Sequence, residues 1–273
     1  MESLHNKVAI ITGGSSGIGR ATAHALAEHG ARIVVADINA EGADTVAADI
    51  TRTGGQAVGV RCDVAEESAF DDLKAFTLGH FGQVDVVMNN VGVLTSGRPD
   101  HLPVEEWQRI ININLFSVVR SNAAFLPPLI EQGSGHIINT ASFAGLFTYA
   151  YDRLPYAACK AAIVQISEGL RVYLHPQGIG VTVLCPGPVL TNISASMPPT
   201  FGPAVGIRGP GEQFALLDPE VVGEQVAEAV LNDTFMLYTH DQVRDVLVDR
   251  ASDWNAFIAR QTDKIAQNPG IFL

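Results

Sequence analysis

Short apolar runs alternate along the chain with longer stretches in which apolar positions recur every three or four residues. The short runs are typical of strands buried on both faces, and they lie at residues 7–12, 32–37, 56–61, 84–89, 136–141, 179–185 and 235–239. The longer stretches have the period of amphipathic helices, and they lie at residues 18–29, 40–53, 65–80, 104–131, 154–175, 218 onward and 241–267. This alternation predicts an α/β fold, a single Rossmann-type doubly wound parallel sheet with helices on both faces.

Residues 191–217 interrupt the alternation with four prolines and four glycines, directly after the predicted strand at 179–185. Folds of this class bind ligands at the carboxyl ends of their strands, so we interpret this segment as a substrate lid rather than an idle loop. The chain has no internal repeat and no low-complexity linker. We therefore expect one domain over residues 1–273, with the lid at about 191–217 and a helical tail at about 241–267.

Composition limits the partners and the compartment. Hydrophobic residues make up 47% of the chain and charged residues 17%, enough for a large core, while the net charge of −12 disfavours nucleic acid as a partner. Cys62, Cys159 and Cys185 are widely spaced and form no Cys-x-x-Cys, which predicts free thiols in a reducing compartment and no metal site. The sequence shows no secretion signal and no apolar run of roughly 20 residues, so we expect a cytoplasmic protein with no membrane partner.

A glycine-rich turn separates the first predicted strand from the first helix. Its candidate phosphate-binding residues are Gly13, Ser15, Ser16, Gly17, Ile18 and Gly19. Glycines here let backbone N–H groups approach a pyrophosphate at the helix N-terminus, although the spacing is Gly-x-x-x-Gly-x-Gly and a plain tight turn is the alternative. Asp37 closes the second strand, where a carboxylate can accept hydrogen bonds from adenosine ribose and repel a 2′-phosphate. A helix-capping aspartate is the alternative; with the turn, Asp37 favours NAD over NADP.

Tyr156 and Lys160 are four residues apart on a predicted helix, so the phenol and the ammonium share a face. A tyrosine pKa near 10 makes a poor base at neutral pH, and a nearby positive charge favours the phenolate. We expect Lys160 and a positively charged nicotinamide to lower the Tyr156 pKa together. An ordinary surface pair on a helix is the alternative, and Cys159 between them is interpreted as a packing residue rather than a redox group.

Several motifs taken in order resemble the compact short-chain dehydrogenases/reductases over about residues 5–240. The resemblance rests on Thr12-Gly13-x-x-x-Gly17-Ile18-Gly19, Asp63-Val64, Asn89-Asn90-Val91-Gly92, Asn114, Ser142, Tyr156-x-x-x-Lys160 and Pro186-Gly187-x-x-x-Thr191. It implies that Tyr156 is the general acid/base, that Ser142 orients the substrate oxygen, and that Lys160 holds the nicotinamide ribose. Asn114 resembles the residue whose main chain holds a water in the proton relay. The further cofactor contacts it implies are Ile38, Cys62, Asp63, Val64, Asn90, Val91, Gly92, Pro186, Gly187, Val189 and Thr191.

The function expected from these residues is that of an NAD(H)-dependent oxidoreductase that interconverts a secondary alcohol and a ketone. The candidate substrate pocket is apolar and aromatic, which favours a hydrophobic small molecule, aromatic or cyclic among the candidates. It comprises Val93, Leu94, Phe143, Phe147, Tyr149 and Tyr151. One alternative is a catalytically silent NAD-binding sensor or structural protein, and another is an epimerase or dehydratase of the longer, extended relatives.

Relatives of this family pair through the two long helices, here at about 104–131 and 154–175. The second helix carries apolar residues that cannot all face its own sheet: Ala157, Ala161, Ile163, Val164 and Leu170. The family's closing Val-Asp-Gly-Gly pattern is absent and residues 241–267 replace it. We therefore expect a homodimer, with a homotetramer as the alternative.

Overall fold

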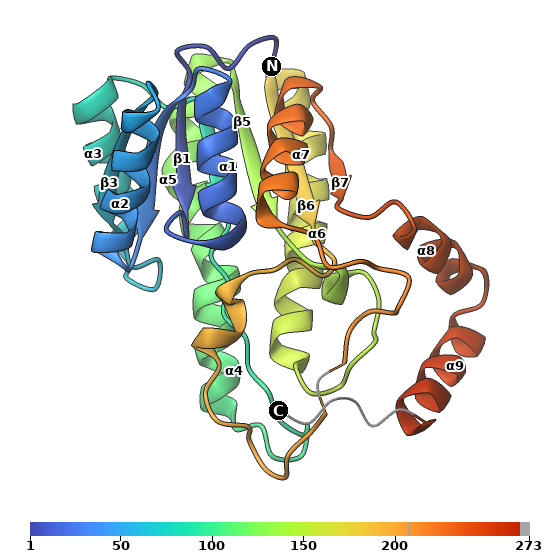
Figure 1. The fold of residues 1–273 in the computed structure, drawn as a ribbon. Helices are drawn as coiled ribbons and strands as arrows, with labels where there is room; N and C mark the ends of the chain where they lie inside the picture. The colour runs from blue at the N-terminus through green and yellow to red at the C-terminus, as the bar shows by residue number, and fades with distance from the viewer. Residues whose placement is uncertain (207, 268–273) are drawn as a thin grey trace.

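A computed structural model describes residues 1–206 and 208–267; Ile207, within the predicted lid, and residues 268–273, at the end of the predicted domain, lie outside the described residues. Seven parallel strands form one sheet in the order β3-β2-β1-β4-β5-β6-β7 (Figure 1). The strands are β1 (Val8–Thr12), β2 (Arg32–Asp37), β3 (Gln56–Arg61), β4 (Val86–Asn89), β5 (Gly135–Thr140), β6 (Ile179–Cys185) and β7 (Met236–Tyr238). The predicted doubly wound α/β fold is confirmed. The strand order reverses between β1 and β4, the position where such sheets open a ligand crevice.

Strand boundaries follow backbone pairing more closely than apolar content. β4 begins at Val86, two residues later than predicted, and the carboxylate of Asp85 just before it accepts hydrogen bonds from the Val8 N–H at 2.9 Å and from Lys7 Nζ at 3.0 Å. β7 is limited to Met236–Tyr238, which pair with Val183–Cys185 of β6. The central strands are buried on both faces, as their sequences predict.

Helices cover both faces of the sheet (Figure 1). One face carries α1 (Gly17–Glu28), α2 (Ala40–Arg52) and α7 (Pro219–Leu231), whose apolar residues share a core with β1 and β2. The other carries α3 (Ala69–Phe81), α5 (Ser117–Gln132) and α6 (Leu154–Leu174). Gly223 of α7 allows the close approach to α1, because a Cβ there would lie 2.7 Å from the Ala21 backbone.

The helix predicted over residues 104–131 is divided into three parts. α4 (Val104–Ile111) leads into a π-helical turn, η1 (Asn112–Phe116), and then into α5. Among the described residues, this run alone has the length and composition of a membrane-crossing helix. Phe125 and Leu129 within it are buried in the core, and α5 contacts β4 and β5. The run is therefore packed as a core helix of this fold.

Two segments extend beyond the layered core. The lid segment contains a short 3-10 helix, η4 (Asn192–Ser196), and its return leg pairs through a bridge between Val189 and Leu217. The predicted tail consists of two helices, α8 (Val243–Ser252) and α9 (Trp254–Gln267), which lie beyond β7 at the side of the molecule (Figure 1). The short 3-10 turns η2 (Phe143–Gly145) and η3 (His175–Gln177) complete the described elements.

Candidate active site

The structure brings the four predicted catalytic residues together at the carboxyl edge of the sheet, and all four are buried. Ser142 lies two residues after the end of β5 and directly before the short helix over Phe143–Gly145. Asn114 lies in η1, and Tyr156 and Lys160 lie on one face of α6. The Lys160 Nζ atom is 5.5 Å from the centroid of the Tyr156 ring. The Asn114 side chain holds both backbone groups of Val93, accepting from its N–H at 2.8 Å and donating to its carbonyl at 2.9 Å.

A buried chain of polar side chains sets the position of α6 against the sheet. Asn89 Nδ2 donates to Asn139 Oδ1 at 2.9 Å, and Asn139 Nδ2 donates to Ser167 Oγ at 3.0 Å. The Ser167 hydroxyl in turn donates to the Ile163 carbonyl at 2.7 Å. Because this chain spans β4, β5 and α6, it holds the helix that carries Tyr156 in one register.

The environment of Tyr156 acts against the phenolate. Burial raises the pKa of Tyr156, while hydrogen bonding to Ser142 and the charge of Arg153 lower it by less. Within the chain itself, desolvation outweighs the positive charge of Arg153, and the expectation that Lys160 and a bound nicotinamide together lower this pKa stays a prediction. The raised pKa favours the protonated phenol over the phenolate.

Lys160 offers hydrogen-bond donors to a ligand. Its Nζ donates to the Thr140 carbonyl at 2.6 Å. Among the described residues, this carbonyl is the one hydrogen-bond acceptor of the Lys160 ammonium. An ammonium has three N–H groups, and a Cβ placed on Gly92 would lie 3.4 Å from Nζ. Desolvation lowers the pKa of Lys160 to about 8. A buried ammonium with spare donors beside the backbone of Gly92 fits the ribose hydroxyls of a dinucleotide.

The Cys159 thiol donates a long hydrogen bond to the Ile110 carbonyl, with Sγ 3.9 Å from the oxygen. Burial raises the pKa of this thiol to about 11. Within residues 1–206 and 208–267, no group of three or more His, Cys, Asp or Glu side chains is arranged to hold a metal ion. The ionisable chemistry of this site is therefore that of Tyr156 and Lys160.

The glycine-rich turn joins β1 to α1 in the predicted manner. Gly13 and Gly17 have φ of 65° and 51°, which favour glycine, and the Gly13 carbonyl accepts from Asn90 Nδ2 at 3.3 Å. A Cβ at Gly17 would lie 3.1 Å from the Thr191 methyl group, so the segment after β6 closes directly over the turn. Backbone of this shape, at a helix N-terminus, can present its N–H groups to a pyrophosphate.

Asp37 is attached to the same turn. Its Oδ2 accepts from the Ser15 N–H at 3.0 Å and its Oδ1 accepts from the Asn39 N–H at 2.9 Å. The second bond forms an Asx-type turn rather than a helix cap, because the N-cap of α2 is Asn39, whose side chain accepts from the Gly42 N–H at 3.1 Å. The first bond links the carboxylate to the glycine-rich turn. Both oxygens retain a lone pair for a ribose hydroxyl.

The other predicted cofactor residues lie along the same edge, at the ends of β2, β3, β4 and β6. They are Ile38, which is exposed, Cys62, Asp63 and Val64 after β3, Asn90, Val91 and Gly92 after β4, and Pro186, Gly187, Val189 and Thr191 after β6. Asp63 Oδ1 accepts from the Ala65 N–H at 3.0 Å, which fixes that turn. Ser16 precedes α1 in extended conformation and Ile18 packs partly against the core.

The predicted substrate wall divides into two layers. Val93, Leu94, Tyr149 and Tyr151 are half-buried, whereas Phe143 and Phe147 are 1% and 3% exposed. The two phenylalanines are covered because they pack in an aromatic cluster with Phe214 of the lid and Phe257 of α9. Their prediction as wall residues is therefore corrected, since they form the layer behind the wall.

Arg153 is a cationic residue beside Tyr149 of this wall, and it is paired with Asp152. It forms two hydrogen bonds with the buried Asp152 carboxylate, at 3.3 and 3.2 Å, and lies 6.0 Å from the Tyr149 ring. The Arg153 charge is thereby neutralised. The lid meets this loop, because Arg153 Nη2 donates to the Arg208 carbonyl at 3.4 Å and the Arg208 guanidinium lies 5.0 Å from the Tyr151 ring.

Three features of the site were missed by the sequence reasoning. The sequence marks Arg153 as a candidate polar contact in the apolar pocket, but it does not reveal the ion pair of Arg153 with Asp152. Arg250 of α8 donates to the Leu146 carbonyl at 2.6 Å, so the tail supports the loop after Ser142. His240, after β7, has no motif to mark it and is buried between the lid and the turn at Gly187.

Comparison with known proteins gives a consistent result. The family model described as short chain dehydrogenase matches residues 7–200. The chain is 34% identical over 196 residues, 72% of its own length and 78% of the relative's, to 2,5-dichloro-2,5-cyclohexadiene-1,4-diol dehydrogenase LinX of Sphingobium indicum. It is also 33% identical over 246 residues, 90% of the chain and 100% of the relative, to an uncharacterized oxidoreductase of Staphylococcus aureus strain MW2.

Solved structures agree with the fold. A short chain dehydrogenase/reductase from Burkholderia phymatum in complex with NAD has a TM-score of 0.82 and 28% identity, covering 100% of this chain and 99% of that one. A 3-ketoacyl-(acyl-carrier-protein) reductase from Brucella melitensis complexed with NADH has a TM-score of 0.75 and 27% identity, covering 87% and 98%. With a family model that matches most of its length, the chain belongs to the short-chain dehydrogenase family of oxidoreductases.

Proposed function

We propose that the protein is an NAD(H)-dependent oxidoreductase that interconverts a secondary alcohol and a ketone. The observation that carries the proposal is the buried grouping of Ser142, Tyr156 and Lys160, with spare ammonium donors beside the backbone of Gly92. When bound, the nicotinamide cofactor supplies or accepts the hydride. The residues of the chain hold the substrate oxygen and exchange its proton.

Ser142 and Tyr156 share the proton chemistry. Ser142 Oγ accepts a hydrogen bond from the Ala144 N–H at 3.2 Å, so the hydroxyl proton remains available for the substrate oxygen. Tyr156 donates its phenolic proton to that oxygen during reduction and takes it back during oxidation. Lys160 orients the ribose hydroxyls and, with a pKa of about 8, can pass a proton onward near neutral pH.

The cofactor preference follows from the residues around the adenosine ribose. Asp37 presents a carboxylate there, and Ser15, Ser16, Ile38 and Asn39 offer no cation to a 2′-phosphate. The Burkholderia phymatum neighbour is bound to NAD and the Brucella melitensis neighbour to NADH. These features support NAD as the cofactor.

The substrate we propose is a hydrophobic cyclic alcohol and its ketone. The outer wall of the pocket is apolar and aromatic, and Asp152 neutralises Arg153, so this pair presents no net charge to an acidic substrate. The relative LinX is named for its action on a cyclohexadiene diol, which has the same character.

A turnover screen tests this function directly. Cyclic and aromatic secondary alcohols are offered with NAD, and with NADP in parallel, while NADH absorbance is followed. We expect turnover of hydrophobic cyclic alcohols with NAD well above that with NADP. Binding of NAD in calorimetry without turnover of any alcohol or ketone would instead identify a silent cofactor-binding protein.

We further propose that two chains pair through the outer faces of α5 and α6. Of the five apolar residues predicted on this helix, Ile163 is buried in the chain's own core and Ala157, Val164 and Leu170 are partly buried, whereas Ala161 is exposed. The exposed large apolar residues on this face are Phe116 and Val119 near the start of α5, and Val172 and Tyr173 at the end of α6.

Light scattering measures this assembly. The chain has a mass of 29.0 kDa, and we expect a particle of twice that mass at micromolar concentration. Val172→Glu, at a residue 79% exposed, is expected to shift the mass toward the single chain. Val248→Glu on α8, 69% exposed, is the matched control and is expected to leave the mass unchanged. A tetramer would show that another surface pairs as well.

A further inference from the structure

Thr239 and His240 directly follow β7, and both side chains are buried. The His240 ring packs against two phenyl rings, with centroids 5.9 Å from Phe143 and 5.7 Å from Phe214. Phe143 belongs to the loop after Ser142, and Phe214 belongs to the end of the lid. The imidazole therefore lies where the substrate loop and the lid meet.

The hydrogen bonds around this pair have one consistent direction. His240 Nε2 is 2.7 Å from the Ala215 carbonyl, which can only accept, so Nε2 carries a proton. The Gly187 N–H donates to Thr239 Oγ1 at 2.9 Å, and Thr239 Oγ1 is 2.8 Å from His240 Nδ1. In the neutral imidazole, the Thr239 hydroxyl therefore donates to Nδ1. A continuous chain of bonds runs from the backbone of Gly187 to the backbone of Ala215.

Gly187 is packed directly beneath the same imidazole. A Cβ at this position would lie 2.7 Å from His240 Nδ1 and 2.7 Å from Phe143 Cε2. The Pro186 carbonyl next to it accepts from the Phe143 N–H at 2.9 Å. The turn after β6 is thus held between the loop that follows Ser142 and His240, and only a glycine fits there.

The lid returns alongside this turn. The Leu217 N–H donates to the Pro188 carbonyl at 3.1 Å, and the Leu190 N–H donates to the Leu217 carbonyl at 2.8 Å. Ala215, which His240 holds, lies two residues before this pairing begins. The paired segment contains Val189 and ends next to Thr191, two residues assigned to the cofactor.

We propose that His240 is a positioning residue that fixes the base of the lid to the turn carrying the cofactor contacts. Together with Thr239 it sets the spacing between Ala215 and Gly187, so that closure of the lid over substrate and placement of Val189 against the cofactor occur together. His240 acts through these segments and does not touch the reacting atoms. The role of the turn as a cofactor contact rests on the proposed function.

Two substitutions separate the hydrogen bonds from the packing. Thr239→Val removes the hydroxyl and keeps the shape, and His240→Phe keeps a ring between the two phenyl groups and removes both bonds. We expect either change to raise the NAD Kd measured by calorimetry, and the KM for the alcohol, by about tenfold, as expected when buried polar groups lose their partners. The expected change in kcat is less than about threefold, with an unchanged pH profile, and Thr239→Ser is expected to restore both constants.

The matched control lies at the other end of the sheet. His136 and Thr182 are also buried and joined by a 2.8 Å hydrogen bond, and neither lies near the lid. Thr182→Val is expected to lower the melting temperature about as much as Thr239→Val while leaving Kd and KM unchanged. If Thr239→Val and His240→Phe also change only the melting temperature, the positioning role is overturned.

Limited proteolysis of residues 191–217 provides a readout that needs no turnover. We expect both His240→Phe and Thr239→Val to expose the lid to cleavage, and Thr182→Val to leave it protected. If one of the two variants fails to fold, the other carries the comparison. A wild-type protein that turns over no alcohol would defeat the proposed function, whereas an unchanged cleavage pattern and NAD Kd in the folded variants would defeat the role of His240.

Discussion

Each end of the sheet buries a histidine against a threonine. At the amino end, His136 Nε2 is 2.8 Å from Thr182 Oγ1, whose proton goes to the Thr234 carbonyl at 2.6 Å. These groups belong to β5, β6 and the turn before β7, all parts of the rigid core. At the carboxyl end, His240 bonds through Thr239 to a turn and directly to the lid. The same pair of side chains therefore secures strands at one end and loops at the other.

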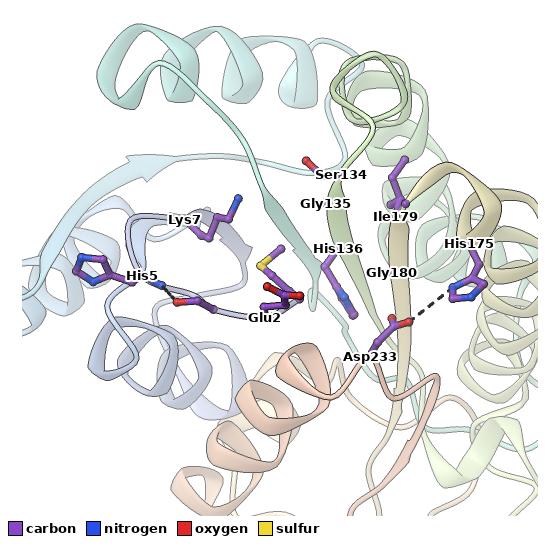
Figure 2. Close-up of a pocket in the computed structure, with 13 residues that line it drawn as sticks. Glu2, His5, Lys7, Ser134, Gly135, His136, His175, Ile179, Gly180 and Asp233 are labelled. Atoms are coloured by element: carbon purple, nitrogen blue, oxygen red, sulfur yellow. Dashed lines mark hydrogen bonds and ion pairs between the residues drawn. The ribbon is translucent and has the colours of Figure 1, made fainter.

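One cavity of the molecule lies at the end of the sheet opposite the candidate active site. A cavity of about 570 Å³ opens at the amino end, lined by residues that include Lys7, His136, His175 and Asp233 (Figure 2). Two of its charged groups are paired: Asp233 accepts from Arg171 Nη2 at 2.8 Å, and Lys7 pairs with Asp85. At the other end, Lys160 is buried with spare donors. The candidate site is therefore distinguished by the unused hydrogen-bond donors of Lys160 rather than by the volume of a cavity.

If the chemistry lies at the carboxyl end of the sheet, the largest expected effect on turnover comes from Tyr156→Phe. The substitution removes the exchangeable proton and keeps the ring, so we expect turnover to fall by about 10³-fold, within the range of general acid/base catalysis. The NAD Kd is expected to stay within about twofold, since the phenyl ring keeps its packing. Steady-state rates and calorimetry measure the two effects, and turnover near that of the wild type would contradict the assigned acid/base.

The fold was predictable because its determinants are local. Apolar runs and helical periods located all seven strands to within two residues, and buried parallel strands with helices between them allow few topologies. The π-helical turn at Asn112–Phe116 was not predictable from the period. It lies where the Asn114 side chain bonds the backbone of Val93, a contact that exists only after β4 is in place.

The candidate site was predictable only where spacing alone decides it. Tyr156 and Lys160 share a face because a helix places residues four apart together. His240 bonds a carbonyl 25 residues away, and Thr239 bonds an N–H 52 residues away, so neither role has a signature in the sequence. The effect of the chain's own groups on the Tyr156 pKa has no signature in the sequence either, since it depends on how deeply the tertiary packing buries the phenol.

Substitution of Asp37 is expected to have a smaller effect, on the affinity for NAD and on the preference for NAD over NADP. Asp37→Ala removes the carboxylate beside the glycine-rich turn, so we expect the NAD Kd to rise about tenfold and the preference over NADP to narrow. Asp37→Asn separates the two contributions, because the amide keeps an acceptor for the Ser15 N–H but removes the charge that repels a 2′-phosphate. Calorimetry with both cofactors measures this; a wild type that binds NADP more tightly would contradict the role of Asp37.

The smallest effect on activity, and one confined to stability, is expected at His136. Burial lowers its pKa from the ordinary 6.5 to about 3. Between these values the unfolded chain binds one more proton than the folded chain, so stability falls as the pH falls, by up to about 1.4 kcal/mol per pH unit from this group. Above pH 6.5 both states hold a neutral imidazole and the contribution to the slope vanishes.

His136→Gln isolates this contribution, because the amide can still donate to Thr182 but takes up no proton at these pH values. Chemical denaturation at a series of pH values is expected to give parallel stability curves above pH 7 and a steeper loss for the wild type between pH 6.5 and 4. Titration of the carboxylates is common to both proteins and largely cancels in the difference. Turnover at neutral pH is expected to stay within about twofold, because the pair at the amino end contacts strands and not the lid. Stability curves of the two proteins that remain parallel down to pH 4 would mean that the folded protein accommodates the charged His136 imidazole. The lowered pKa of His136 would then be contradicted.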